Sequence, residues 1–128
     1  MKICISSIGK NLSSSVDPRF GRCPYFLIVD SEKAKKFEVI ENTGTQAQHG
    51  AGVTAAQIIA NQKIDIAISG NFGPNAYIVL SQAGIKCYTV SGSISVKEAL
   101  QLLDQGKLQQ IIKASSGHPD NDFVAEKK

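Results

Sequence analysis

Tryptophan is absent from the sequence, cysteine occurs only three times, and charged residues make up only 20% of the 128 residues. An odd, low cysteine count argues against a disulfide scaffold and predicts reduced thiols in the cytoplasm. No apolar run approaches the roughly 20 residues of a membrane-spanning helix. The N-terminal stretch becomes polar too early for a signal peptide. We therefore expect a cytoplasmic protein that does not contact a membrane.

Positive charge is in small excess and lies partly at the chain end. The formal net charge is +3, and Lys127 and Lys128 supply two of these positive charges. Without them, 12 basic residues face 11 acidic ones. A nucleic-acid-binding domain usually carries a denser basic stripe, so we expect no nucleic-acid partner.

The remaining composition, with 42% hydrophobic residues, is typical of a folded domain. The length corresponds to one domain, and we assign residues 1–113 to it. Residues 114–128 have almost no apolar content and contain Gly117, Pro119 and Asn121. We expect them to form a disordered C-terminal tail.

The hydrophobic pattern predicts an α/β domain. Short apolar runs predict strands at residues 2–6, 25–30, 37–41, 64–69 and 85–90, and helical spacing predicts helices at 53–62 and 74–83 and a third, capped by Ser95, that ends near Asp104. A short turn or helix is expected at residues 108–112. The first three strands suit an antiparallel meander, whereas the strand–helix alternation of the second half predicts parallel strands.

Three polar loops that contain glycine adjoin or face the carboxyl ends of the predicted parallel strands. They are residues 6–22, 49–52 and 70–74. In open α/β sheets, ligands bind beyond these strand ends. We therefore expect the three loops to meet in one binding site.

The first loop concentrates charge next to a thiol. Arg19, Arg22 and Cys23 lie within five residues. Guanidinium groups suit anions with several oxygens, and neighbouring cations should favour the Cys23 thiolate, which is a soft-metal ligand. The segment alone leaves a plainer alternative open, in which Cys23 packs as a small apolar residue and both arginines are solvated.

Two helix starts contribute glycines and one histidine. His49 precedes Gly50 and Gly52, where free backbone amides attract anions and a neutral imidazole can ligate a metal. The alternative is that His49 caps the helix or faces solvent. Gly70 and Gly73 flank the second helix start, which by itself is equally compatible with a tight turn.

Residues for acid–base catalysis are scarce near these loops. Asp17 is the only acid in the first loop, and Asp65 falls at the amino end of its strand. A ribonuclease H-type nuclease needs several carboxylates that hold divalent metals at the sheet centre, whereas the first strand offers Cys4 and Ser6. No Cys-x-x-Cys pair is present for a closed zinc site, and we expect Cys4 and Cys87 in the core. We therefore predict that the protein is not an enzyme and has no catalytic residue.

Five short segments recur in an order that is typical of one protein family. They are residues 1–3 (MKI), 20–26 (FGRCPYF), 49–52 (HGAG), 70–76 (GNFGPNA) and 83–86 (AGIK), the last followed by a glycine and a helix with Glu-Ala-Leu. Together they make the chain, over about residues 1–112, resemble the dinitrogenase iron–molybdenum cofactor biosynthesis/binding family.

This resemblance implies a ribonuclease H-like α/β fold with helices on both faces of a five-stranded mixed sheet. The implied strand order is 3-2-1-4-5, with the second strand antiparallel. Nitrogenase-associated members carry or bind an iron–sulfur–molybdenum cofactor or its precursors, and many other members have no assigned role. The segment 20–23 and His49 match positions suspected of touching the cluster. Members often carry histidine at the position of Arg19, and some carry alanine at that of Cys23.

We therefore predict a non-catalytic binding or carrier protein for an iron–sulfur/molybdenum cluster or a similar metal–sulfur anion, with cluster donor or acceptor proteins as partners. The candidate metal ligands are Cys23 and His49, and the candidate cofactor-binding residues are Arg19, Phe20, Gly21, Arg22, Gly50, Gly52, Gly70, Asn71, Gly73 and Asn75. The arginines and two helix amino termini would offset the cluster charge. The alternatives are a protein-interaction or regulatory module and a binder of a small anionic metabolite.

Overall fold

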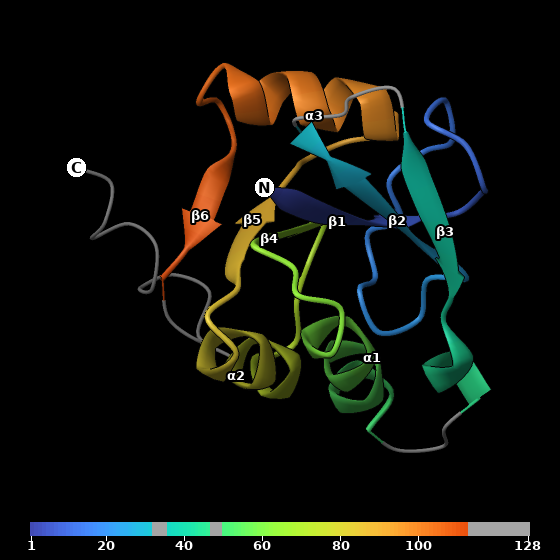
Figure 1. Cartoon of the computed structure of the whole chain (residues 1–128), viewed down its shortest axis with the longest axis vertical. Helices are drawn as coiled ribbons and strands as arrows, with labels where there is room; N and C mark the ends of the chain where they lie inside the picture. The colour runs from blue at the N-terminus through green and yellow to red at the C-terminus, as the bar shows by residue number, and fades with distance from the viewer. Residues whose placement is uncertain (32–35, 47–49, 113–128) are drawn as a thin grey trace.

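A mixed six-stranded sheet forms the middle layer of the computed structural model, which describes residues 1–31, 36–46 and 50–112. The strands are β1 (Lys2–Ser7), β2 (Tyr25–Asp30), β3 (Phe37–Glu41), β4 (Ile66–Ser69), β5 (Lys86–Thr89) and β6 (Gln109–Ile111). The helices are α1 (Ala51–Ala60), α2 (Pro74–Gln82) and α3 (Val96–Asp104), with the short 3-10 helix η2 (Thr43–Gln46). The strand order is β3-β2-β1-β4-β5-β6 (Figure 1).

The strand directions confirm the predicted meander and the predicted parallel half. β2 is antiparallel to both β1 and β3, whereas β4 is parallel to β1 and β5 is parallel to β4. The first five strands therefore have the predicted order 3-2-1-4-5. The predicted count of five is wrong, because β6 pairs antiparallel with β5 where a turn or helix was expected.

β6 escaped the sequence analysis because its own residues carry little strand signal. Two of its three residues are glutamines, and only Ile111 is buried. Pairing with β5 and the burial of Ile111 in the core supply what the local pattern lacks. The predicted tail at residues 114–128 lies outside the described residues.

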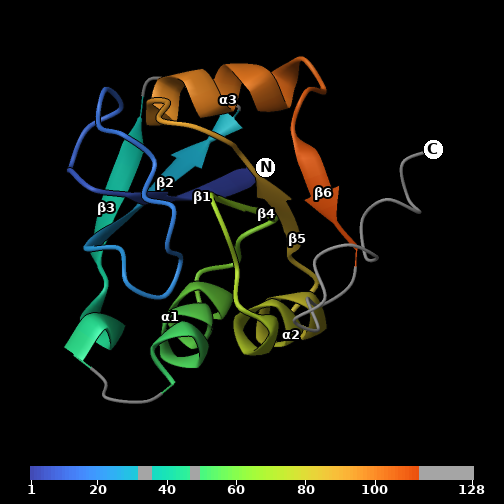
Figure 2. The same cartoon turned by 180° about the vertical axis from the view of Figure 1, so that it is seen from behind.

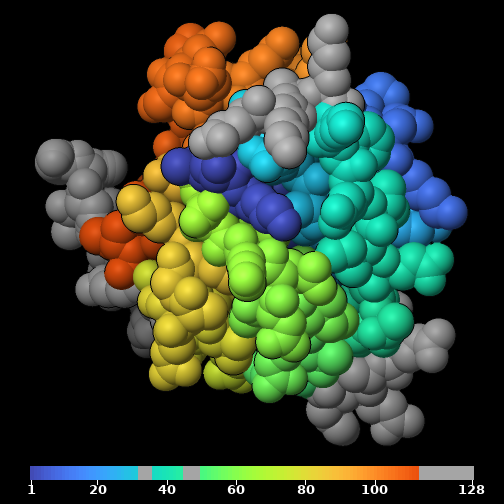
Figure 3. All heavy atoms as spheres, in the orientation of Figure 1, coloured from blue at the N-terminus to red at the C-terminus, as the bar shows by residue number. Residues whose placement is uncertain are grey.

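Helices cover both faces of the sheet, as Figure 2 shows from behind. Alternate residues of a strand point to opposite faces, so Cys4 and Ile28 pack with α1 and α2, while Ile3 and Ile5 pack with α3. α1 and α2 lie side by side, and their surfaces adjoin in green and yellow in Figure 3. None of the helices in the described part of the chain is long and apolar enough to span a membrane.

The α3 start confirms the predicted capping box. The Ser95 hydroxyl accepts the Glu98 backbone N–H at 3.0 Å, and the Glu98 carboxylate accepts the Ser95 N–H at 2.9 Å. These two bonds satisfy donors that a helix end otherwise leaves unpaired. The cap fixes where α3 begins over the sheet.

The loop between β1 and β2 is held in place by the start of α3. Val16 forms an isolated bridge with Ser7, and Ser15 forms one with Ser95. The Val16 N–H also donates to the Ile94 carbonyl at 2.8 Å. As a result, residues 17–23 are directed back across the carboxyl end of β1.

Candidate functional site

The turn 17–23 lies between the start of α1 and the connection from β4 to α2. A Cβ atom on Gly21 would stand 2.8 Å from the Gly52 Cα, and one on Gly70 would stand 2.6 Å from the Pro18 Cα. Ordinary side chains do not fit at such distances, so glycine is required for this approach. The described parts of the three predicted loops therefore meet at one edge of the sheet, and the chain itself occupies the space that these two glycines leave.

The chain fills the crevice at the strand-order reversal. β1 and β4 are neighbours there, and the hydroxyl of Ser6, the next-to-last residue of β1, lies 2.9 Å from that of Ser69, the last residue of β4. The Asp17 carbonyl oxygen lies 2.7 Å from the Ser6 Oγ and 3.3 Å from the Ser69 Oγ. This crevice is the usual ligand position in open α/β sheets. A ligand would therefore bind on the rim outside Asp17.

Arg19 is paired with a buried carboxylate. The Asp17 side chain is 1% exposed, and its Oδ1 accepts the Arg19 backbone N–H at 2.8 Å and the Arg19 Nε at 3.3 Å. The Arg19 side chain is 65% exposed. The hydrogen bond to Asp17, helped by its negative charge, raises the pKa of the Arg19 guanidinium. Arg19 reaches solvent at the rim, but the Asp17 carboxylate offsets part of its positive charge.

Cys23 is buried behind this turn. Its Sγ donates to the Phe20 carbonyl at 3.4 Å, and no part of the residue is exposed. Burial, followed by the negative charge of Asp17, raises the pKa of the Cys23 thiol to about 12. The sequence predicted that the neighbouring arginines would favour the Cys23 thiolate, and this prediction is wrong because burial and the Asp17 charge set the direction of the shift. The thiol is protonated at neutral pH in this conformation.

Phe20 belongs to the core. It is 2% exposed, and its ring lies 5.1 Å from that of Phe26 and 5.0 Å from that of Phe72. The aromatic contacts anchor the middle of the turn 17–23. The neighbouring Arg22 is exposed at the surface.

Two helix starts adjoin this turn. α1 begins after Gly50, whose φ is +74°, and α2 begins after Gly73 with Pro74 in its first turn. Among the described residues, no side chain caps either start. The first amide groups of a helix have no partner within the helix, and they attract negative charge. The two starts are close, since a Cβ on Gly52 would stand 3.4 Å from the Ala76 Cβ.

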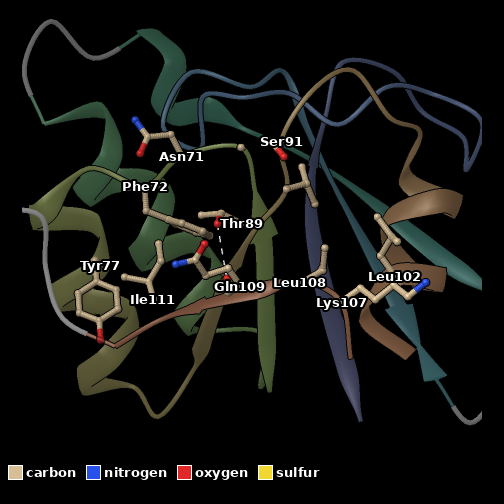
Figure 4. A pocket seen from close by; sticks show the side chains of 12 residues that line it. Asn71, Phe72, Tyr77, Thr89, Ser91, Leu102, Lys107, Leu108, Gln109 and Ile111 are labelled. Carbon is tan, nitrogen blue, oxygen red and sulfur yellow. Dashed lines mark hydrogen bonds between the residues drawn. The ribbon is translucent and has the colours of Figure 1, made fainter. Parts of the chain in front are cut away.

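A cleft of about 550 Å³ lies on the other side of the β4–α2 connection. Figure 4 shows Phe72, Thr89 and Gln109 close together within it, with Ser91 and Lys107 further along. The cleft is also lined by Gly70 and Asn71, Tyr77, Val90, Leu102, Leu108 and Ile111. It therefore opens at the carboxyl ends of β4 and β5, and only two predicted site residues line it.

The sequence resembles known proteins over most of its length. The family model described as dinitrogenase iron-molybdenum cofactor matches residues 1–106. The chain belongs to this family. An uncharacterized protein of Methanocaldococcus jannaschii is 40% identical over 112 residues, which are 86% of this chain and 91% of that protein.

Two solved structures extend the likeness to three dimensions. The apo form of the orange protein from Desulfovibrio gigas has a TM-score of 0.85 at 31% identity, covering 90% of this chain and 96% of that one. A NifB-like protein from Thermotoga has a TM-score of 0.77 at 35% identity, covering 89% and 96%. The α/β fold with its mixed sheet is therefore shared with these proteins.

In this member of the dinitrogenase iron-molybdenum cofactor family, the predicted site residues fall into three groups. Arg19, Arg22, Gly50, Gly52, Gly70, Asn71, Gly73 and Asn75 lie on the rim where the loops meet, Phe20, Gly21 and Cys23 lie in the turn behind it, and His49 lies outside the described residues. Among the residues that the structure describes, no three His, Cys, Asp or Glu side chains are arranged to hold a metal ion.

The sequence analysis assigned no role to the residues that hold the turn in place. Asp17 was noted only as an acid, and Asn42 and Ser69 were not considered. Both stand directly beyond or at the end of predicted strands, 37–41 and 64–69, where polar side chains often hold loops. Their position at the strand ends was the sequence signal that could have identified Asn42 and Ser69.

Proposed function

We propose that the protein is a non-catalytic binding or carrier protein for an iron–sulfur/molybdenum cluster or a similar metal–sulfur anion. The observation that carries the proposal is the pair of neighbouring helix starts, uncapped by described side chains, beside the arginine-bearing turn 17–23. Family membership and the likeness to the orange protein support this class of cargo.

The charges at the rim suit loose attachment of an anion. Each helix start contributes the equivalent of about half a positive charge, and Arg19 and Arg22 add two guanidinium groups. Asp17 offsets part of the Arg19 charge. A site of this strength holds an anion and also releases it, which a carrier requires.

Cys23 and His49 are the proposed cluster ligands. Ligation by Cys23 would form a bond from its sulfur to a metal, while the thiol proton goes to solvent. The thiol is buried against the Phe20 carbonyl, so ligation requires the turn 20–23 to open. A cluster held by few bonds is consistent with the scarcity of grouped metal ligands among the described residues.

We expect Cys23→Ala to weaken cluster uptake and to leave the fold intact. Anaerobic reconstitution of the full chain with iron, sulfide and molybdate, followed by desalting and optical spectroscopy, measures the uptake. We expect apparent affinity to fall by about tenfold or more, the usual scale when a metal ligand's setting is disturbed. Cys87→Ala is the matched control, since it removes a buried thiol from the same core cluster, in β5.

The outcomes separate the parts of this proposal. A wild type that stays colourless under all conditions contradicts the carrier function. A Cys23→Ala protein as coloured as the wild type removes Cys23 as a ligand and leaves attachment to the helix starts and arginines. Loss of uptake in both alanine variants assigns the effect to the core rather than to the site.

The cleft of about 550 Å³ favours a second candidate function, binding of a small anionic metabolite. Lys107 is the only charged side chain among its described lining residues. A panel of carboxylated and phosphorylated metabolites should then raise the melting temperature of the wild type by about 10 °C at a hundred times Kd, and that of Lys107→Glu by much less. No shift with any compound, or equal shifts in both proteins, would contradict this candidate.

Three further expectations belong to the proposal. The ribonuclease H-like classification is supported by the order of the first five strands. The cytoplasmic location is supported by three cysteines without disulfides. Cluster donor or acceptor proteins are the proposed partners.

A further inference from the structure

Asn42 buries a side-chain amide directly behind the Cys23 turn. The residue follows β3 and is 4% exposed. Its Nδ2 donates to the Cys23 carbonyl at 2.9 Å and to the Gly21 carbonyl at 3.2 Å, and it lies 3.9 Å from the Cys23 Sγ. Both donor contacts therefore fall on the turn that carries the proposed ligand.

The other end of the same amide is anchored on the next segment. Asn42 Oδ1 accepts the Gly44 N–H at 3.0 Å, at the start of η2, and the Asn42 backbone N–H donates to the Pro24 carbonyl at 3.0 Å. η2 in turn packs against α1. One side chain thus ties the Cys23 turn to the segment that leads into α1.

The Cys23 thiol is held among polar groups of the closed turn. Its Sγ donates to the Phe20 carbonyl at 3.4 Å and lies 3.9 Å from the Asn42 Nδ2, and a backbone hydrogen bond from Ser7 also reaches the thiol. No surface of Cys23 is exposed while the turn keeps this shape. Each amide-to-carbonyl contact favours the closed turn by roughly two- to tenfold, the net strength of a protein hydrogen bond.

We propose that Asn42 is a positioning residue that keeps the turn 20–23 closed, and that Cys23 becomes accessible only while the Asn42 contacts to the Gly21 and Cys23 carbonyls are broken. Delivery of the thiol to a cluster is the part of this inference that rests on the proposed function. Closure itself is a property of the chain without cargo. The two parts are therefore tested with separate readouts.

Closure is tested by site-resolved alkylation of the full chain. Iodoacetamide labelling of Cys4, Cys23 and Cys87 is followed by peptide mass spectrometry in the wild type, Asn42→Ala and the control Asn61→Ala, an exposed asparagine after α1. We expect the Cys23 rate in Asn42→Ala to rise about tenfold, with Cys4 and Cys87 unchanged. Asn42→Asp, which keeps an acceptor for Gly44 and loses the donor, should have the same selective effect.

Two results would overturn the closure role. Equal acceleration at all three cysteines would show a merely structural effect of Asn42, and an unchanged Cys23 rate would show that other contacts hold the turn. If Asn42→Ala does not fold, the alkylation rates of the three cysteines are measured in Asn42→Asp and judged by the same two criteria.

Delivery is tested by reconstitution with iron, sulfide and molybdate. Faster colour development in Asn42→Ala than in the wild type supports delivery, and the gain should disappear in Asn42→Ala/Cys23→Ala. If Asn42→Ala makes Cys23 selectively reactive toward iodoacetamide but does not speed cluster loading, ligation by Cys23 is contradicted. The role of Asn42 in closing the turn would still hold.

Discussion

A rise in pH from about 8 to about 11 is expected to lower the free energy of unfolding steeply, because three buried thiols must stay protonated in the folded chain. Burial raises the pKa of Cys23 and Cys87 to about 12 and that of Cys4 well above its usual value. In the unfolded chain these thiols ionise near pH 8.5. Above that pH the unfolded state binds fewer protons, so stability that is fully present below it is lost as the pH rises toward 12.

The expected loss is large compared with the stability of a small domain. One thiol contributes about 1.4 kcal/mol per pH unit across this window, so three thiols contribute roughly 4 kcal/mol per pH unit. Total stabilities of such domains are about 5–15 kcal/mol. A rise of a few pH units above 8.5 should therefore be enough to unfold the protein.

Urea unfolding at several pH values between about 7.5 and 10.5 measures this slope. Cys87→Ala, compared with the wild type, should be less stable at neutral pH yet lose stability more slowly as the pH rises, by about 1.4 kcal/mol per pH unit. Tyrosine and lysine ionisation cancels in this comparison because both proteins contain the same groups. Identical slopes would mean that Cys87 ionises in the folded protein.

Gly70→Ala is expected to destabilise the fold and to disturb the candidate site at the same time. The added methyl group would stand 2.6 Å from the Pro18 Cα and 2.9 Å from its Cβ, so the turn 17–23 has to move. Overpacking of this kind costs about 1–3 kcal/mol. Urea unfolding measures the loss, and reconstitution measures the accompanying loss of cluster uptake.

Gly73→Ser is the matched control from the same connection. No atom lies within 4 Å of a Cβ at Gly73, and its φ of −68° suits any residue. A serine there can cap α2, so stability should stay unchanged or rise by a few tenths of a kcal/mol. Equal destabilisation in both variants would show that the β4–α2 connection, rather than the contact with Pro18, is sensitive to substitution.

Local signals were sufficient to predict much of the fold. Ser95 and Glu98 predicted the cap of α3, and Gly84 predicted the end of α2, where its φ is +81°. The apolar runs predicted β1, β2 and β4, because strands that are buried on both faces appear in the sequence as continuous hydrophobic runs. β6 could not be predicted in this way, because its pairing with β5 is a tertiary contact.

The meeting of the glycine loops was predicted, but the chemistry of the side chains around it was predicted less well. The meeting of the glycine loops followed from a general rule about strand ends. The state of Cys23 did not follow from its neighbours in sequence, because burial and Asp17 act on it through space. Arg19 was assigned to an external anion, while its nearest partner is the carboxylate two residues before it.

The contact between the hydroxyls of Ser6 and Ser69 joins residues 63 positions apart in the chain. A ribosome that has released β1, β2 and β3 has therefore not yet produced the partner that closes the floor beneath Asp17. Nascent chains of that length, and fragments that end before β4, lack the platform for the turn 17–23. If the proposed cargo binds at this rim, it can bind only after β4 has been translated.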